Sequence, residues 1–469
     1  MRGFSRVFAL VLVIVAISLV EVEGQTVGKG GLTLAMIERM RQSFVLDAPT
    51  RAAMNALANN EIKDLTLNRE VLVTSDHIFA HKIKTGGITD QKSSGRCWLF
   101  AGLNIMRPAI MEKYSLKDFD FSENYLFFWD KLEKANLFLE SVIATRKKDI
   151  YDREVEWLLR HPFPDGGQWC FVADLINKYG AVPESAMPET KSSGGTGMMN
   201  RLVARKLRQD AATLRSMSEK GEGELALRAK KEEMLQEIYR MLAMNLGVPP
   251  TEFVWRYETK DDSVSAAMTY TPQEFYREVV GVSLDDYVCL YDCPTRPYSK
   301  LYQISMDRDM FDRPNMTFIN LEIDELKDYA LASIMDDEPV WFGCDVGKED
   351  YYDKGVMAPG IYDYGALYGV DVQLTKTERI LYRESIPTHA MVFTGIDTVD
   401  GTPVKWLVEN SWGDDRGKKG YWAMDDEWFD EYVFAIVVHE KYVPGRVLDI
   451  LDTEPTVLPP WDPMYSFMR

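Results

Sequence analysis

The spacing of hydrophobic residues predicts helices in the first part of the chain and strands in the last. Beyond Ser94, four residues recur at the i, i+3, i+4 and i+7 positions of a helix: Leu99, Gly102, Leu103 and Met106. This spacing places Cys97 in the first turn of a helix, with Ser93 and Ser94 available as caps. The segments FSENYLFFWDKLEKANLFLE and DIYDREVEWLLR also carry apolar residues at helical spacing and predict further core helices.

The region from Met198 to Leu246 predicts a long helical hairpin. Charges of both signs alternate along it, and one apolar stripe consists of Met234, Leu235, Ile238, Met241 and Leu242. The preceding run KSSGGTG, residues 191–197, is rich in glycine and serine and is typical of a flexible connector.

After residue 330 the pattern becomes that of strands. Short runs rich in Val, Phe, Tyr and Trp are bounded by Gly, Asp and Asn, namely PVWFGCDVG, HAMVFTGID, PVKWLVENSW, GYWAM and FAIVVHE. They predict a twisted antiparallel sheet, and the fold class is therefore α+β. A second β-rich passage, REVLVTSDHIFAHKIKT, is expected at residues 69–85.

Composition and charge narrow the range of functions. The chain has 469 residues, is 46% hydrophobic and carries a formal charge of −19. It is long enough for a large core, and its negative charge repels phosphate backbones and anionic membrane surfaces. Non-specific binding of nucleic acid is not expected.

The first residues predict export. Arg2 and Arg6 precede an uncharged apolar run from Val7 to Val20, and small or apolar residues suited to cleavage end at Gly24. This is the pattern of a secretory signal peptide over residues 1–24, which would leave a periplasmic or secreted protein. A membrane anchor is the alternative, but the apolar run is short for a bilayer span.

The cysteines do not predict a disulfide scaffold or a metal site. There are five in the whole chain, with no CxxC pair and no histidine-rich cluster, so no metal and no cofactor is expected. Cys289 and Cys293 form either a disulfide or two small buried thiols.

Cys97 is a candidate nucleophile. At the start of a helix it lies at the positive end of the helix dipole, which favours the reactive thiolate. The alternative is a small buried hydrophobic residue. A nucleophile needs a base, and among five histidines His389 is the best placed, because it begins the strand HAMVFTGID and a strand would hold its ring rigidly.

Two amides complete the candidate site. Asn410 follows a strand 21 residues after His389, and its amide oxygen would fix the imidazole tautomer while Trp412 shields that bond from water. Gln91, on the loop before the helix, supplies a donor to an oxyanion hole together with the backbone N–H of Cys97.

Gln, Cys, His and Asn in this order resemble the papain-like cysteine peptidases. Cys97 and His389 lie 292 residues apart, whereas papain-type enzymes separate them by roughly 130–150, so a large insertion is expected. QKSSGRCW, DGGQW, KYGAVPESAMPET, FGCDVGK, THAMVFTG and VENSWG are similar to the bleomycin hydrolase and aminopeptidase C family from about residue 60 to the end.

The resemblance implies a function and an architecture. It implies a thiol aminopeptidase with Cys97 as nucleophile, His389 as general base and acid, Asn410 as orienter and Gln91 in the oxyanion hole. It also implies peptide substrates and a papain-like core assembled as a homohexamer. The expected parts are a signal peptide (1–24), a helical half with the nucleophile (25–190), an inserted helical region (191–330), a β-rich half (331–445) and a C-terminal arm (446–469).

The last residues, DTEPTVLPPWDPMYSFMR, contain four prolines and no glycine and predict a stiff extended arm rather than a strand, with a disordered terminus as the alternative. The resemblance implies that this arm lies in the active-site cleft and positions substrate through Met468 and Arg469. Trp412, within the site, is a further residue expected to position substrate. An arm that blocks one side of the cleft produces an aminopeptidase. Without that block we expect an endopeptidase, and without reactivity at Cys97 a peptide-binding scaffold.

Overall fold

The computed structural model describes residues 30–464, so the signal peptide predicted over residues 1–24 lies outside the described part. The chain divides after Leu65 into two compact units, each described by itself. The first contains α1 (Leu34–Ser43) and α2 (Ala48–Leu57), and α3 (Ile62–Thr66) ends at the boundary. No helix within residues 30–464 is both long and apolar enough to cross a membrane.

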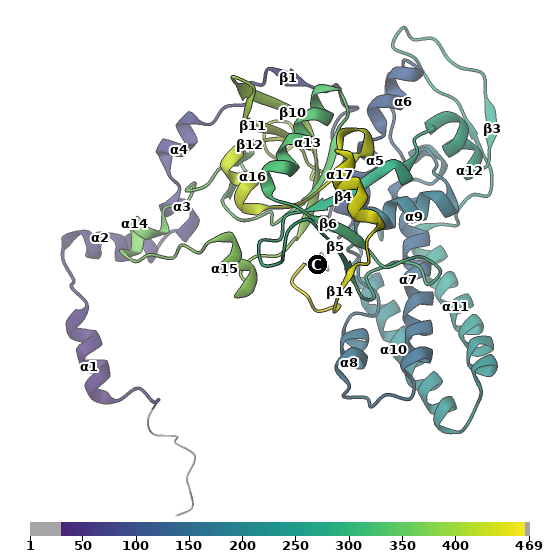
Figure 1. Ribbon diagram of the computed structural model, residues 1–469, viewed down its shortest axis with the longest axis horizontal. Helices are drawn as coiled ribbons and strands as arrows, with labels where there is room; N and C mark the ends of the chain where they lie inside the picture. The colour runs from purple at the N-terminus through teal and green to yellow at the C-terminus, as the bar shows by residue number, and fades with distance from the viewer. Residues whose placement is uncertain (1–29, 465–469) are drawn as a thin grey trace, which may run out of the picture. The chain divides into compact units, whose positions relative to one another are not determined.

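A large mixed sheet forms one part of the second unit (Figure 1). Its strands, in spatial order, are β14 (Thr456–Leu458), β5 (Lys300–Ile304), β6 (Thr317–Asn320), β4 (Tyr287–Tyr291), β13 (Val433–His439), β7 (Val340–Cys344), β10 (His389–Val399), β11 (Thr402–Glu409), β12 (Tyr421–Asp425), β9 (Val356–Met357) and β8 (Asp350–Tyr351), and β1 (His81–Lys82) pairs with β10. Most neighbours are antiparallel, as predicted, but β14 with β5, β4 with β6 and β12 with β9 are parallel.

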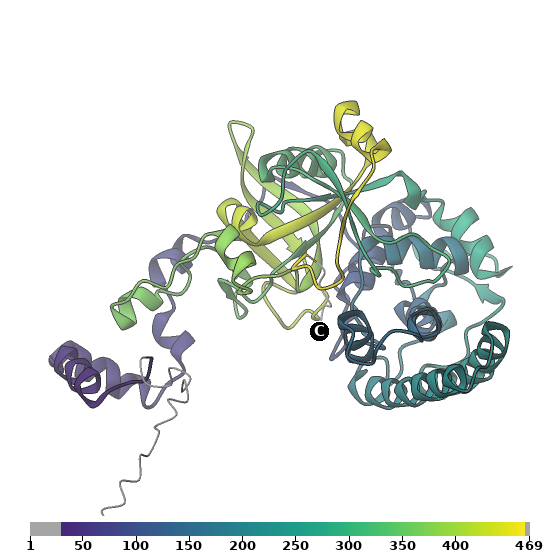
Figure 2. The ribbon, with the colours of Figure 1, turned by 60° about the horizontal axis from the view of Figure 1, so that its bottom comes forward.

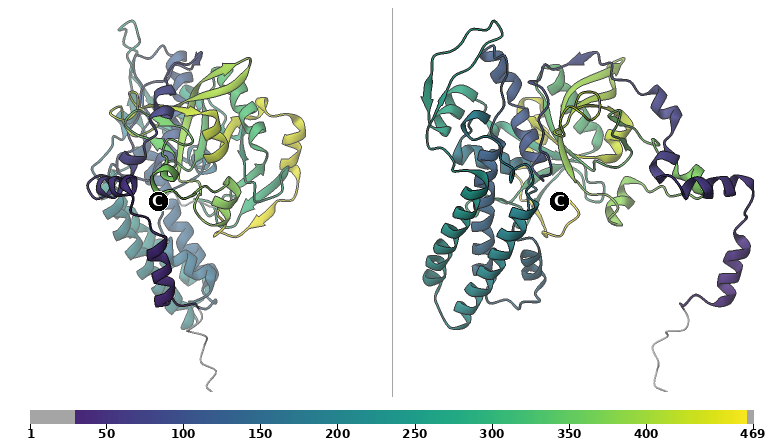
Figure 3. Two further views of the ribbon diagram at one scale, coloured as in Figure 1. Left: turned by 90° about the vertical axis from the view of Figure 1, so that its left-hand side faces the viewer. Right: turned by 180° about the vertical axis from the view of Figure 1, so that it is seen from behind.

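The helical part lies beside the sheet. It contains α5 (Cys97–Asn104), α6 (Arg107–Lys113), α7 (Glu123–Thr145), α8 (Arg153–Arg160), α9 (Trp169–Tyr179), α10 (Gly197–Glu219) and α11 (Glu224–Leu246). Helix α7 begins where the Ser122 hydroxyl accepts a hydrogen bond from the backbone N–H of Tyr125, at 3.1 Å. The hairpin of α10 and α11 packs along α7, as Figures 2 and 3 show, which confirms the hairpin predicted from the charge pattern.

Further helices and strands lie outside these two groups, and two of the strands pair as a separate two-stranded sheet. They are α4 (Arg69–Thr74), β2 (Phe253–Trp255), β3 (Met268–Tyr270), α12 (Pro272–Glu274), a π-helical turn (Phe275–Val280), α13 (Ile323–Met335), α14 (Tyr364–Tyr368), α15 (Lys376–Leu381), α16 (Asp426–Tyr432) and α17 (Gly445–Leu448). Helices α13 and α16 pack on the face of the sheet opposite α5.

Strand β10 is apolar on both sides because both faces of the sheet are covered. Ala390 and Val392 belong to the core shared with α5 and α7, whereas Met391 and Phe393 belong to the core under α13 and α16. This explains why the strand reads as a continuous hydrophobic run rather than an alternating one. A strand buried on both faces is a rigid support for the residue at its end, which is His389.

Three local predictions were wrong. The passage at 69–85 contains helix α4, capped by the Asn68 side chain, and a strand of two residues. The run at 191–197 is not a loose connector, because the Ser193 side chain is fully buried and its hydroxyl donates to Glu189 at 2.7 Å. Strand pairing also begins earlier than residue 330, since β4, β5 and β6 belong to the main sheet.

Candidate active site

Cys97 is the first residue of α5 and is 2% exposed. No side chain caps this helix, so the predicted capping by Ser93 or Ser94 is not found. The sulfur accepts a hydrogen bond from the backbone N–H of Ala390, the second residue of β10. This contact brings the nucleophile candidate to the start of the strand that carries His389.

His389 bonds to Asn410, as predicted. Its Nε2 lies 2.9 Å from the Oδ1 of Asn410, and the backbone N–H of Ser411 donates to the same oxygen at 2.8 Å. Because that oxygen accepts from Ser411, it is an acceptor toward the ring as well, and Nε2 carries the proton. The unprotonated nitrogen is then Nδ1, which is the atom able to accept a proton from a thiol.

Trp412 covers the ring of His389. The two rings stack with their centroids 4.7 Å apart and their planes at 29°, and the indole also stacks on Tyr352 and meets the edge of Trp422. The indole therefore shields the imidazole from water, as expected from the sequence. The other four histidines, His77, His81, His161 and His439, are half-buried.

Gln91 is held from both ends of its amide. The Ser411 hydroxyl donates to Oε1 at 2.7 Å, and Nε2 donates to the backbone oxygen of Ser94 at 2.6 Å. The Gln91 backbone N–H also donates to the Ser411 oxygen at 2.9 Å. One N–H of the side chain is used by Ser94, and within residues 30–464 the second keeps no protein acceptor, which suits a donor reserved for an oxyanion.

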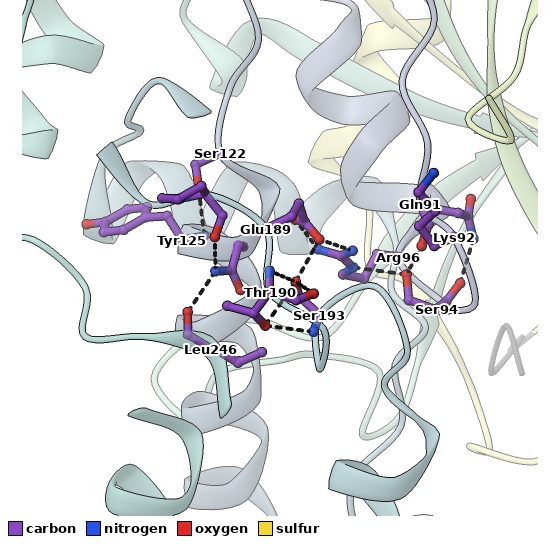
Figure 4. Close-up of polar contacts among 12 residues, drawn as sticks. Gln91, Lys92, Ser94, Arg96, Ser122, Tyr125, Glu189, Thr190, Ser193 and Leu246 are labelled. Atoms are coloured by element: carbon purple, nitrogen blue, oxygen red, sulfur yellow. Dashed lines mark hydrogen bonds and ion pairs between the residues drawn. The ribbon is translucent and has the colours of Figure 1, made fainter. Parts of the chain in front are cut away.

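The loop between Gln91 and Cys97 is fastened to the segment that leads into the helical hairpin. Arg96 is fully buried and binds Glu189 through two parallel hydrogen bonds of 2.7 Å, and its Nε donates to the Ser94 hydroxyl at 3.0 Å. Figure 4 shows the guanidinium between these two partners, with Ser193 bound to the far side of the carboxylate. The loop is thus positioned by residues far along the chain, as the oxyanion donor requires.

Burial controls the protonation of both Cys97 and His389. Burial raises the pKa of the Cys97 thiol to about 11, although backbone N–H groups of Ala390 and Trp98 lower it in part. Burial also lowers the pKa of His389 to about 4, opposed by the bond to Asn410. Each group alone is therefore neutral near pH 7, in contrast to the free thiolate expected from the helix position. Proton transfer from sulfur to imidazole creates a pair whose mutual attraction offsets the loss of hydration.

The C-terminal arm is described as far as Met464, so the predicted substrate-positioning residues Met468 and Arg469 lie outside the described residues. The arm includes the short parallel strand β14, where only an extended segment was expected. Beyond it, the Trp461 ring lies 4.0 Å from the Arg153 guanidinium on α8, and Asp462 pairs with Arg296. Met464 is buried, so this part of the arm is fixed against the helical half.

Sequence reasoning missed residues that position the site. Ser411 orients Gln91, Glu189 neutralises Arg96, and Asp165 accepts a hydrogen bond from the Gly95 backbone N–H at 3.3 Å. Ser411 stands directly after Asn410, and its adjacency was the one available signal. Asp165 lies 70 residues after Gly95, and Glu189 lies 93 residues after Arg96. No local sequence pattern relates either residue to the loop.

None of the five cysteines forms a disulfide within residues 30–464. Cys289 and Cys293 do not form the disulfide considered as one alternative, and they are half-buried and buried, respectively. Burial raises the pKa of the Cys289 thiol to about 12 and also raises that of Cys293. Neither has the environment of a reactive thiolate.

Comparison with known proteins identifies the family. The model of the Peptidase C1-like family matches residues 31–465, and the chain belongs to this family. It is 40% identical to aminopeptidase C of Streptococcus thermophilus, over 93% of this chain and 98% of that protein. It is also 40% identical to human bleomycin hydrolase, over 92% and 98% of the two chains.

A solved structure has the same fold. The crystal structure of PepW from Lactobacillus rhamnosis HN001 superposes with a TM-score of 0.91 at 41% identity, covering 93% of this chain and 99% of that one. The α+β papain-like fold and the family predicted from the sequence motifs are therefore confirmed.

Proposed function

We propose that this member of the Peptidase C1-like family is a thiol-dependent aminopeptidase, which releases N-terminal residues from peptides through an acyl-enzyme on Cys97. The observation that carries the proposal is the contact between the Cys97 sulfur and the backbone N–H that follows His389, whose ring is bonded to Asn410. The relatives named aminopeptidase C and bleomycin hydrolase support the same activity.

The first half of the reaction forms a thioester. His389 Nδ1 takes the proton from the Cys97 sulfur as the sulfur attacks the peptide carbonyl carbon. The carbonyl oxygen becomes an oxyanion, which accepts hydrogen bonds from the free N–H of Gln91 and the backbone N–H of Cys97. The tetrahedral intermediate collapses when the imidazolium gives its proton to the leaving amine, and the C–N bond breaks.

The second half regenerates the thiol. Water enters where the amine left, and His389 accepts its proton as the oxygen attacks the thioester carbon. The C–S bond then breaks, and the sulfur recovers the proton from the imidazolium. The amino acid leaves as a carboxylic acid, which releases its proton to solvent and becomes a carboxylate. Asn410 keeps the ring in one tautomer through both halves because its oxygen only accepts.

The direction of cleavage is proposed to depend on the C-terminal arm. Its described part runs to α8. Trp157 within that helix and His161 directly after it line a cavity together with Gly166 and Gly167. We propose that the arm blocks one side of the cleft and leaves room for a single residue before the scissile bond. Deleting residues 464–469 should shift cleavage of a defined peptide mixture toward internal bonds, and an unchanged pattern would refute this role.

The central test is a Cys97→Ala variant. It should abolish hydrolysis of aminoacyl reporter amides while circular dichroism and thermal unfolding stay unchanged. Turnover equal to that of the unaltered protein would overturn the assignment. The alternative, a peptide-binding scaffold, predicts no Cys97-dependent turnover and slow alkylation of this thiol by iodoacetamide at mildly acidic pH.

We also propose that the chain is exported and that it assembles as a homohexamer. Export rests on the charged and apolar pattern of residues 1–24, and the hexamer on the family resemblance. Fractionation of cells, with N-terminal sequencing of the mature protein, tests the first. Light scattering coupled to size-exclusion chromatography tests the second, and a monomer mass at micromolar concentration would refute it.

A further inference from the structure

A groove of about 810 Å³ adjoins the loop between the oxyanion donor and the nucleophile. One wall is formed by residues 92–95 of this loop, a second by residues 160–165, and a third by one face of α10. Gly95 stands two residues before Cys97, so the groove is lined by the loop that leads into the helix of the proposed nucleophile. No step of the proposed reaction uses its outer walls.

The α10 wall is positively charged. Arg201, Ala204, Arg205 and Arg208 line the groove at the i, i+3, i+4 and i+7 positions of one helix face. Within residues 30–464, no carboxylate lies within 4.0 Å of any of these three guanidinium groups. Arg208 is fixed by bonds to the backbone oxygens of Leu159 and Arg160, at 2.9 and 3.3 Å.

The one carboxylate in the groove is already neutralised. Burial raises the pKa of Asp165, but the charge of Lys131, 2.6 Å away, and bonds from Thr196 and Asn200 outweigh it and hold that pKa well below its usual range. Asp165 is therefore ionised and fully paired. Lys92 and Arg160 also line the walls, but they pair with Asp90 and Glu156, respectively. The positive field of the groove therefore comes from the three arginines of α10, in a chain whose total charge is −19.

The position of the groove identifies which part of a substrate enters it. A carbonyl that reacts at Cys97 and is bound by Gln91 lies across the loop that joins these two residues. We take the side chain of the same substrate residue to lie along residues 93–95, which line the groove. In an aminopeptidase this residue is the N-terminal one.

We infer that this groove selects peptides with an acidic N-terminal residue, whose carboxylate is bound by the arginines of α10. The inference rests on the proposed aminopeptidase activity and adds its substrate class. Guanidinium groups bind carboxylates well because their paired donors match the two oxygens. Glutamate and glutamine differ in charge but hardly in shape, so they isolate this contribution.

The experiment compares kcat/KM for Glu, Gln and Leu reporter amides. In the full-length protein the Glu substrate should be preferred over Gln about tenfold, as expected for two or three partly exposed charge pairs. The ratio should fall toward one in 1 M NaCl, where the screening length is about 3 Å. The doubly substituted Arg201→Gln, Arg205→Gln variant should lose the preference and retain hydrolysis of the Leu substrate.

The matched control is Arg240→Gln, which removes an exposed positive charge from α11, outside the groove. It should leave the Glu to Gln ratio unchanged. A ratio of one in the unaltered protein, or one that salt and the double variant do not change, overturns the inference. Retention of a short DNA by the groove with no effect on the ratio also overturns it. Hydrolysis of the Leu substrate reports the proposed function separately, so the two failures are distinguishable.

Discussion

Removing the Gln91 amide tests whether the site stabilises an oxyanion. In a Gln91→Ala variant the free N–H is lost, while Cys97, His389 and Asn410 keep their contacts. One donor of this kind contributes about 2.7–4 kcal/mol to the transition state, so kcat should fall about 100- to 1,000-fold. KM should change little, because the ground-state carbonyl is bound less strongly than the oxyanion.

Two further variants separate donation from orientation. Ser411→Ala leaves the donor but removes the 2.7 Å bond that aligns Oε1, and loss of about 1 kcal/mol predicts a roughly fivefold lower kcat. Gln91→Glu keeps the shape but directs a carboxylate at the developing negative charge, so it should be slower than Gln91→Ala. These differences are absent if Gln91 has only a structural role.

The assay is steady-state hydrolysis of a Leu reporter amide, with the acylation rate taken from the burst of released amine in rapid mixing. Unfolding in urea, followed for each variant, shows whether stability has changed. A Gln91→Ala enzyme whose acylation rate stays within about threefold of the unaltered protein would refute the oxyanion role. The loss of an oxyanion donor should slow acylation by far more than that.

Three other changes should have distinct effects. Glu189→Gln leaves the buried Arg96 charge unpaired, which should reduce the free energy of unfolding by about 3–5 kcal/mol in urea titrations and lower kcat as the loop loosens. Burial raises the pKa of Glu409 to about 7 from 4.5, so its contribution to stability is greatest below pH 4.5 and is lost as the pH rises through 7. The loss amounts to about 3 kcal/mol, and Glu409→Gln should flatten this pH dependence of urea unfolding; an equally steep profile would contradict it. Gly167→Ala places a Cβ 2.6 Å from the Trp98 ring and should destabilise the protein by about 1–3 kcal/mol in thermal unfolding, whereas an unchanged melting temperature would mean that the ring moves freely.

Local patterns were sufficient for the helical hairpin, for helix α5 and for most strands of the sheet. Each depends on the spacing of apolar residues within a short window, which the sequence contains in full. The prediction for residues 69–85 failed because the valines and isoleucines of this passage favour strands, whereas the Asn68 cap starts a helix there. The prediction for residues 191–197 failed because a run of glycine and serine is typical of a flexible connector. Its hydrogen bond to Glu189 cannot be recognised from the sequence.

The candidate site residues could be proposed from the sequence, whereas the residues that position them could not. Cys97, His389, Asn410 and Gln91 occur in short motifs whose residue types carry the chemistry. Their protonation depends on burial, which arises from the packing of α5 against β10 and has no signature in either segment alone. The pairing of Arg96 with Glu189 similarly joins two segments that the sequence does not relate.

Strand β10 begins with His389, the proposed general base, and is hydrogen-bonded to a neighbour on each side. Amide protons along such a strand exchange with solvent only when the sheet itself opens. His389 therefore cannot be displaced by local unfolding alone, because its strand separates only when the sheet unfolds. Loss of activity on heating and loss of the last protected amides should occur at the same temperature, and the enzyme should stay fully active until it unfolds.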